Sequence, residues 1–299
     1  MAVGRDDHGL RRRAARGELV PLAPGTYLER AAWDAAGPRE RHLLRVHAVL
    51  PRLGGDLVVS HESALALHGF PLLGAWPSQV HVVDRRRRRT LSSRTLVRHA
   101  VPLPPADVAS TGRWSTTTPV RSALDVARRR DLRGAVVLLD HGLHVGAFSL
   151  EEARRGHESR RSSPGSRGLA VALDLAAAAA ESPGESLSRV GMWHRGLAGP
   201  VLQHEFRDSF GVLLGRVDFW WPCCGVVGEF DGDVKYLGRR ERGDRPPEQV
   251  ALDEKTREDR IRALPQVRGF ARWDWADALA VEPMIARLHA AGLAHCTHA

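Results

Sequence analysis

Three short apolar segments follow one another in the C-terminal part of the chain, and turn residues separate them. Residues 201–206 and 212–220 flank the turn Asp208–Gly211, and residues 225–231 follow Pro222. Segments of this length, bounded by Gly, Pro and Asp, are typical of β-strands. Amphipathic patterns predict helices over 182–195, 248–264 and 275–291, and a fourth strand over 267–273. The predicted order of elements is therefore α-β-β-β-α-β-α.

Two of these predicted strands carry acidic residues within an otherwise apolar run. Asp218 lies in one strand and Glu229 in the next, and Glu229 shares a strand face with Asp231 because side chains alternate along a strand. Burial of a lone carboxylate is unfavourable. Two carboxylates ~4 Å apart repel by about 4 kcal/mol at an effective dielectric constant of 20. A divalent cation would remove that repulsion, and a set of oxygen ligands favours Mg²⁺ or Mn²⁺ over zinc.

The motifs of this region resemble those of the restriction-endonuclease-like (PD-(D/E)XK) superfamily. The resemblance is to the branch around very-short-patch repair endonucleases known as domain of unknown function 559. It spans roughly residues 180–280 and is carried by the motifs Ser182–Glu185, Val217–Phe219, Glu229–Gly232 and Lys255–Ile261. It implies a restriction-endonuclease-like αβββαβ core and a Mg²⁺-dependent endonuclease that cleaves DNA phosphodiester bonds.

The resemblance also implies roles for individual residues. Asp218 and Glu229 would hold the metal ion, assisted by the carbonyl group of Phe230, with Glu185 as the third acid. Family members carry a lysine two residues after the glutamate, where this chain has Asp231. Lys235 and Lys255, the two lysines of the chain, are candidates to replace it. The expected catalytic residues are therefore Asp218, Glu229, Asp231 and Lys235, and the expected metal ligands are Asp218, Glu229 and Glu185.

Each of these assignments has a structural alternative. Ser182 and Glu185 also match a capping box, in which the glutamate side chain accepts a hydrogen bond from the backbone amide of the serine. Asp231 and Gly232 form a good turn pair in any context. The missing lysine motivates a second interpretation of the whole protein, a non-catalytic transcriptional regulator or antitoxin with a vestigial nuclease fold. Whether the chain is an enzyme is left open by the sequence.

The N-terminal part shows a different pattern. Residues 9–28 predict a short basic helix that ends at Gly17 and two strands around Pro24-Gly25, which is the second half of a winged helix-turn-helix. With residues 60–70, SHESALALHGF, this region resembles the winged-helix region of AbiEi-type antitoxins over about residues 9–130. The resemblance expects a further helix before Gly9, so either the start codon is misassigned or the DNA-binding unit is degenerate. His61 and His68 are interpreted as helix-end residues rather than ligands.

Charge divides the chain unevenly. Residues 1–180 contain 28 basic and 17 acidic residues, whereas residues 181–299 contain 16 basic and 18 acidic residues. A basic region favours a polyanionic partner. The strongest candidates for contacts with DNA phosphates lie in two arginine clusters: Arg11, Arg12, Arg13 and Arg16 in the first, and Arg85, Arg86 and Arg87 in the second. RNA as the nucleic acid and a homodimer as the assembly both stay open.

We expect a mixed α/β (α+β) protein in three parts. These are a winged-helix-like DNA-binding region over 1–158, a linker and helix over 159–180, and a nuclease-like domain over 181–299. The linker is predicted from SRRSSPGSRG at 159–168, which is rich in Ser, Gly and Pro. The longest apolar runs fall short of the roughly 20 residues that span a bilayer, and there are three cysteines. These features predict a cytoplasmic protein with no membrane partner. Further predicted elements are helices over 39–50, 61–68, 119–130, 134–143 and 150–157, and strands over 57–60 and 79–84.

Overall fold

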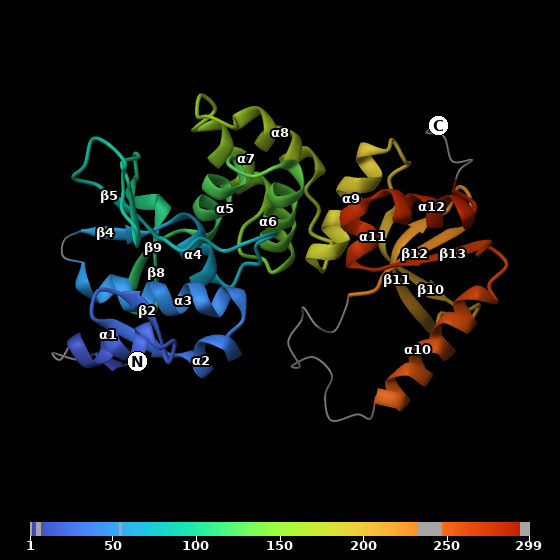
Figure 1. Ribbon diagram of the computed structural model, residues 1–299. Helices are drawn as coiled ribbons and strands as arrows, with labels where there is room; N and C mark the ends of the chain where they lie inside the picture. The colour runs from blue at the N-terminus through green and yellow to red at the C-terminus, as the bar shows by residue number, and fades with distance from the viewer. Residues whose placement is uncertain (1, 4–6, 54–55, 233–246, 294–299) are drawn as a thin grey trace. The chain divides into compact units, whose positions relative to one another are not determined.

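The computed structural model describes residues 2–3, 7–53, 56–232 and 247–293, and side chains are described for all of these except residues 2, 3, 7 and 247–253. The chain divides into two compact units, Met1–Asp174 and Leu175–Ala299 (Figure 1). Helices accompany both parallel and antiparallel strand pairs, so the expected mixed α/β (α+β) class is confirmed. None of the helices that the structure describes combines the length and apolar character of a membrane span.

The first unit begins with a small sheet and its helices. The strands have the order β1-β3-β2 and are antiparallel. Gly17 and Gly25 take positive φ angles, +79° and +63°, where the basic helix ends and where the hairpin turns, as the sequence predicted. The elements are β1 (Ala2–Val3), α1 (Asp7–Ala15), β2 (Leu19–Ala23), β3 (Thr26–Glu29), α2 (Arg30–Ala35) and α3 (Pro38–Val49).

A larger mixed sheet forms the middle of this unit, with the strand order β6-β7-β5-β4-β9-β8. The sequence predicted β4, α4 and β5 but not the other four strands, which are short and, in β8 and β9, rich in Ser and Thr. The elements are the 3₁₀ turn Leu50–Arg52, β4 (Leu57–Val59), α4 (His61–His68), β5 (Val80–Asp84), β6 (Leu91–Ser92), β7 (Leu96–His99), the 3₁₀ turn Pro105–Asp107, β8 (Val108–Thr111) and β9 (Trp114–Thr117).

Four helices complete the first unit: α5 (Pro119–Ala127), α6 (Leu132–His144), α7 (Leu150–Glu158) and α8 (Ser166–Leu175). The first three confirm predicted helices. The fourth lies within residues 159–180, where the sequence predicts a linker and a helix, and it buries Leu169, Ala172 and Leu173. It begins at Ser166, within the last residues of the predicted linker segment 159–168, and the two compact units divide after Asp174.

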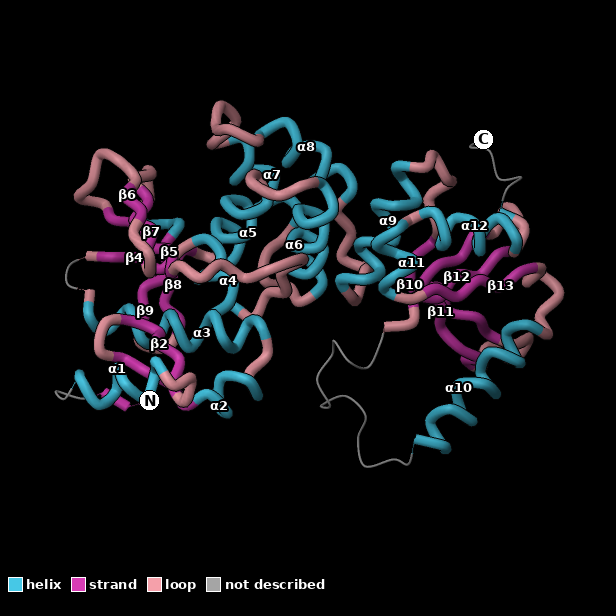
Figure 2. The backbone as a smooth tube through the Cα atoms, in the orientation of Figure 1, coloured by secondary structure: helices cyan, strands magenta, loops and turns pink. Residues whose placement is uncertain are grey.

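The second unit has the predicted order of elements. Its sheet has the order β10-β11-β12-β13, with the first three strands antiparallel and β12 and β13 parallel (Figure 2). The elements are α9 (Pro183–His194), β10 (Val201–Arg207), β11 (Leu213–Trp221), β12 (Val226–Phe230), α10 (Pro247–Arg262), β13 (Gly269–Trp273), α11 (Trp275–Ala280) and α12 (Glu282–Ala290). The predicted last helix is divided at Val281, whose φ is +69°.

Two layers of helix cover this sheet. On one side α10 contributes Ile261 to an apolar cluster with Phe206, Val217 and Trp220. Elsewhere α9 packs against α11, and Ser188 of α9 accepts a 2.8 Å hydrogen bond from the indole of Trp273 in β13. Together these contacts hold α9, β11 and β12, the elements that carry the predicted acids, in one sheet-and-helix framework.

Candidate active site

Asp218 is the centre of the predicted acidic site. It lies in β11 and is half-buried between neighbouring strands. The backbone amide of Phe230 in β12 donates a 2.8 Å hydrogen bond to Asp218 Oδ2. The side-chain amide of Gln203 in β10 lies 3.4 Å from Asp218 Oδ1. Both carboxylate oxygens are therefore oriented by groups from the two strands that flank β11.

Gln203 connects Asp218 to a second acid. Its Nε2 atom also donates a 2.9 Å hydrogen bond to Glu185 Oε2. The strand register, in which Leu202 pairs with Phe219 and His204 with Val217, places Gln203 opposite Asp218. Its φ angle is +52°, a left-handed conformation that is uncommon outside glycine. Backbone strain of this kind clusters at functional sites, where the surrounding structure holds it.

Glu185 lies at the start of α9 and is buried, with 7% of its surface exposed. Its amide donates to Ser182 Oγ at 3.2 Å, which caps the helix as the sequence predicted. Its carboxylate accepts a hydrogen bond from the amide of Glu181, at 3.0 Å, rather than from Ser182 as a capping box requires. The residue before it, Gly184, has no room for a Cβ because the ring of Phe230 packs there. Glu185 therefore serves both the helix start and the acidic site.

The surroundings of Asp218 raise the pKa of its carboxyl group. Burial is the main cause that raises this pKa to about 7, and the neighbouring carboxylate of Glu185 raises it further. The hydrogen bond from Phe230 opposes the rise, and Glu229 adds to it. At neutral pH the carboxyl group is close to half protonated. A cation placed against Asp218 and Glu185 would favour the ionised form and lower this pKa.

Glu229 is buried in β12 but is paired with arginine. Arg257 of α10 forms an ion pair with Glu229 Oε1 at 2.9 Å and donates to the carbonyl of Arg216 at 2.6 Å. Arg272 of β13 lies 3.7 Å from the other carboxylate oxygen. Burial raises the pKa of Glu229, and the two guanidinium groups counteract that rise. Arginines, which stay charged, therefore occupy the place that a metal ion would take beside this acid.

The position of the missing lysine is also held by an ion pair. Asp231 accepts a 2.6 Å hydrogen bond from Arg272, which also contacts Glu254 and Glu258 of α10. Lys255 is exposed on the same helix, and Lys235 lies outside the described residues. Arg257 and Arg272 were missed by sequence analysis, which searched for lysine. Arg272 could have been found from the pairing of β12 with β13, which sets it opposite Glu229.

The three acids do not converge as one metal-ligand trio. In the part of the chain that the structure describes, one group of three metal-ligating side chains has its ligand atoms within 4.8 Å of one another, and it consists of His61, His81 and His99. Sequence analysis interpreted His61 as a helix-end residue and did not connect it with the other two. His68, the other histidine assigned to a helix end, lies at the end of α4 and hydrogen bonds to the carbonyl of Thr117 at 2.8 Å.

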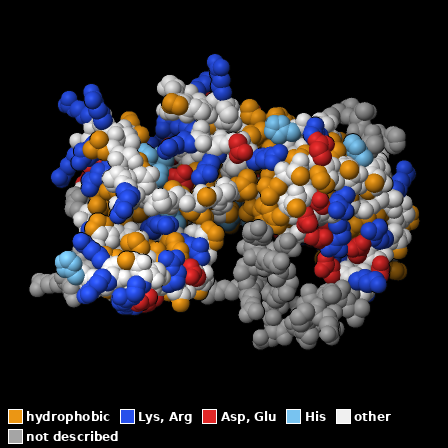
Figure 3. Space-filling model, in the orientation of Figure 1, with side chains coloured by type: hydrophobic (Ala, Val, Ile, Leu, Met, Phe, Trp, Pro, Cys, Tyr) orange, Lys and Arg blue, Asp and Glu red, His pale blue; other side chains and the backbone are white. Residues whose placement is uncertain are grey.

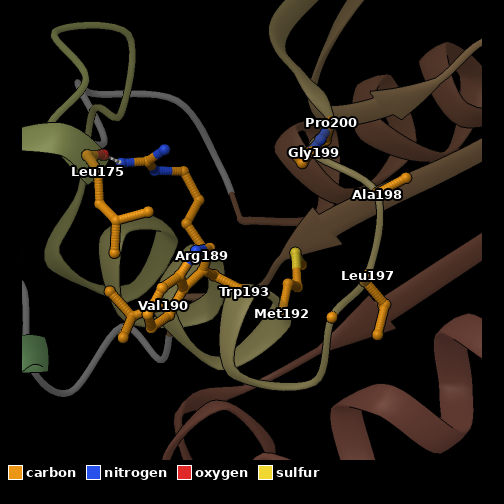
Figure 4. A pocket seen from close by; sticks show the side chains of 10 residues that line it. Leu175, Arg189, Val190, Met192, Trp193, Leu197, Ala198, Gly199 and Pro200 are labelled. Atoms are coloured by element: carbon orange, nitrogen blue, oxygen red, sulfur yellow. Dashed lines mark hydrogen bonds between the residues drawn. The ribbon is translucent and has the colours of Figure 1, made fainter. Parts of the chain in front are cut away.

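A cavity of about 360 Å³ lies near the C-terminal end of α9 (Figure 4). Its walls come from α9 and the segment that leads to β10, including Val190, Met192, Trp193 and Leu197. Arg189 reaches to the carbonyl group of Leu175, as the dashed line in Figure 4 shows. The described residues that line it include no carboxylate, imidazole or thiol. We assign it no catalytic role.

The first group of DNA-binding candidates is partly engaged within the protein. Arg13 pairs with Glu18 and Glu29, both at 3.0 Å, and Arg16 pairs with Glu18 at 2.6 Å. Arg12 is exposed and has no ion-pair partner among the described residues. Arg11 lines a cavity of about 520 Å³ between α1 and the β2–β3 turn, together with two further arginines, Arg45 and Arg94.

The second group lies in the exposed turn that follows β5. Arg85 is 3.6 Å from Asp56, and Arg87 is 2.9 Å from Asp84. Arg86 is exposed, and its side chain has no ion-pair partner in the described structure. Figure 3 shows basic side chains distributed over the visible face of the first unit. Arg12 and Arg86 are therefore the members of the two groups that are exposed and have no ion-pair partner among the described residues.

Comparison of the chain with protein-family models, curated proteins and solved structures finds no match. The functional assignment depends on the site geometry and on the motifs that carry the resemblance.

Replacement of Asp218 by Asn should stabilise the second unit in the absence of divalent cations, and more so at higher pH. The raised pKa means that the folded protein holds this proton more tightly than the unfolded chain. The contribution of Asp218 to the free energy of unfolding therefore falls as the pH rises from about 4 to about 7, and the neutral variant lacks this contribution. We expect a gain on the order of 1–3 kcal/mol near pH 8 and little gain near pH 4.

Thermal unfolding with a chelator, followed across this pH range, measures the effect. Glu205→Gln is the control, because Glu205 is exposed on the neighbouring strand β10 and pairs with Arg207. A gain in Asp218→Asn that does not change with pH would contradict the assigned pKa.

Proposed function

We propose that the second unit is a metal-dependent endonuclease that cleaves DNA with Mg²⁺ or Mn²⁺. The observation that carries this proposal is the pair of acids, the half-buried Asp218 and the buried Glu185, joined by the side chain of Gln203. A structural role gives these two carboxylates no reason to share one hydrogen-bond donor, because the charge of Glu185 raises the pKa of Asp218. The strained backbone of Gln203 supports the same conclusion.

The residues present fit a hard divalent cation. Asp218 and Glu185 supply carboxylate oxygens, and the resemblance adds the carbonyl oxygen of Phe230. Oxygen ligands of this kind suit Mg²⁺ and Mn²⁺. When bound, such an ion stabilises negative charge that develops on phosphate oxygens. Its positive charge would also remove the repulsion that raises the pKa of Asp218.

The chain's own groups have separate tasks in this proposal. The amide of Phe230 holds Asp218 Oδ2, and Gln203 holds the two acids at a set separation. Arg257 supplies a fixed positive charge next to Glu229, which suits a phosphodiester substrate. It does not replace a lysine as a general base, because guanidinium stays protonated. Asp218 is not assigned that role either, because a bound cation lowers its pKa and makes it a weaker base.

A second candidate function is a non-catalytic DNA-binding regulator or antitoxin. The observation that favours it is the neutralisation of Glu229 by Arg257 and of Asp231 by Arg272. If these pairs persist with DNA bound, two of the family's expected catalytic residues are already occupied by protein cations. Calorimetry separates the two candidates, because an active site binds Mg²⁺ or Mn²⁺ in a manner that Asp218→Asn abolishes.

DNA is the proposed partner of the first unit in both cases. The strand order β1-β3-β2 with α1 before the hairpin is compatible with the second half of a winged helix. Arg12 lies on α1, and Arg86 lies in the exposed turn after β5. Phosphate contacts of this type bind DNA without regard to sequence.

Loss of either central acid should abolish plasmid cleavage. Asp218→Asn and Glu185→Gln are expected to lower the rate of nicking of supercoiled DNA with Mg²⁺ or Mn²⁺ by about 100-fold or more, because each removes a metal ligand. Glu205→Gln should cut at close to the wild-type rate. Cleavage that persists in Asp218→Asn would contradict the site. A wild-type protein that neither cuts DNA nor binds either metal would favour the regulator.

Removal of an accessible arginine should weaken DNA binding and lower its salt dependence. Arg12→Ala and Arg86→Ala are each expected to weaken binding similarly on different sequences and to reduce the salt slope by about 1, because one phosphate contact is lost. Fluorescence anisotropy at several salt concentrations measures both effects. Arg155→Ala is the control, since Arg155 is exposed on α7 and pairs with Glu151. Slopes unchanged in both variants would exclude these contacts.

A further inference from the structure

Three buried histidines converge in the first unit from separate elements. His61 begins α4, His81 lies in β5 and His99 ends β7. One ring nitrogen of each lies within 4.8 Å of the other two, and His81 Nδ1 is 3.0 Å from His99 Nε2. Each residue exposes less than a tenth of its surface. Ring nitrogens this close, and removed from water, form a ready set of metal ligands.

The strand pairing explains how the three rings meet. β5 and β7 are parallel neighbours, with His81 opposite Val97 and Val83 opposite His99, so both histidines lie on one face of the sheet. β4 pairs with β5 on the other side, and α4 begins just after β4 ends. This brings His61 over the same face, where its ring stacks on His99 with centroids 3.8 Å apart.

The backbone at His61 is held in an unusual conformation. Its φ angle is +50°, in the left-handed region that non-glycine residues seldom enter. The preceding residue, Ser60, is also buried, and its hydroxyl oxygen lies 3.0 Å from His61 Nδ1. This strained backbone conformation places the ring against the other two, and strained residues of this kind cluster at functional sites.

The three rings are electrically suited to a metal ion. Burial lowers the pKa of His61, His81 and His99, that of His99 to about 4, so the imidazoles are neutral at pH 7. Neutral imidazole is the form that binds metals. Glu62 lies beside them with Oε2 3.7 Å from His81 Nδ1, and within the described structure this buried oxygen accepts no hydrogen bond. His81 Nδ1 is also the nitrogen that faces His99, so this carboxylate adds negative charge on the side of the ring where the ion would lie.

A cavity of about 700 Å³ adjoins the cluster, and His61 and His99 form part of its wall. Arg128, Arg129 and Arg160 also line it. Arg160 pairs with Asp107 at 3.0 Å, and Asp125 also lines the cavity. Among the described residues neither Arg128 nor Arg129 has an ion-pair partner. Their positive charges favour an anion in the cavity next to the histidines.

We propose that His61, His81 and His99 bind one Zn²⁺ ion whose fourth position faces the arginine-lined cavity and takes a phosphate-type oxyanion. Three histidines with an open position are the ligand set of catalytic zinc sites. Imidazole favours zinc and other transition metals over Mg²⁺. Tetrahedral zinc, with bonds of about 2.0–2.1 Å, separates its ligand atoms by roughly 3.4 Å. The contact between His81 and His99 already has a similar length.

Zinc binding by the full-length protein tests the first half of this proposal. Protein freed of metal with a chelator should bind one Zn²⁺ at this site in calorimetry and unfold at a higher temperature once zinc is added. His99→Gln should weaken binding by more than about 100-fold. Glu62→Gln should weaken it to a smaller extent, by removing a negative charge near the ion. His68→Gln and Cys224→Ser should bind as the wild type does, because neither residue belongs to the cluster.

A direct spectroscopic readout keeps the test valid if His99→Gln does not fold. In ¹⁵N-detected spectra of the wild-type histidine rings, zinc should shift the signals of the three cluster histidines and leave His68 unchanged. Failure to bind zinc at micromolar concentration would overturn the proposal. Undiminished binding by a folded His99→Gln, or shifts confined to other histidines, would also overturn it.

Inorganic phosphate tests the second half. The zinc-loaded protein should bind phosphate, and Arg128→Gln and Arg160→Gln should each weaken that binding about 10-fold or more. Arg155→Gln, on the exposed face of α7, is the matched control. Zinc binding without phosphate binding, or phosphate binding that is equal with and without zinc, would overturn the assignment of the open position.

Discussion

The repulsion between the carboxylates of Asp218 and Glu185 is the main electrostatic constraint in the second unit. Burial raises the pKa of Asp218 to about 7, and the neighbouring acid raises it further. Gln203, the amide of Phe230 and the amide of Glu181 all donate hydrogen bonds to these two carboxylates. Three strands and the start of α9 therefore contribute groups to this pair of acids.

Two arginines neutralise acids in this part of the second unit. Arg257 and Arg272 neutralise Glu229 and Asp231, at the positions where the resembling enzymes have a metal ligand and a lysine. The same guanidinium groups would attract a phosphodiester. The charge on Glu229 is therefore compatible with both a nuclease and a regulator. Asp218 and Glu185 distinguish the two, because among the described residues no arginine pairs with either acid.

The sequence predicted the second unit well because its information is local. Turn residues delimit the strands, and alternation places Asp218 and Glu229 inside them, so the order α-β-β-β-α-β followed directly. Gln203, Arg257 and Arg272 were missed because their roles depend on pairing between segments 15 to 43 residues apart. The role of Gln203 could have been predicted, since a hairpin that turns at Asp208–Gly211 places residue 203 opposite residue 218.

The first unit was harder to predict for the same reason. Its short strands β6 to β9 carry weak alternation, and the histidine cluster joins residues from α4, β5 and β7 that are 18 to 38 positions apart. His61 was interpreted as a helix-end residue. This describes the place of its backbone at the start of α4 but not the contact of its ring with His99. A ligand set built across three elements has no spacing signature of the kind that a Cys-x-x-Cys pair provides.

The most direct test of the central claim is the titration of the Asp218 carboxyl group by ¹³C NMR, with and without Mg²⁺. Without the ion, burial and the nearby Glu185 should hold the pKa of Asp218 at about 7. Saturating Mg²⁺ should move it well below its ordinary value, because a bound cation favours the charged form. A pKa near 7 that Mg²⁺ and Mn²⁺ leave unchanged would show that the two acids do not hold a metal ion.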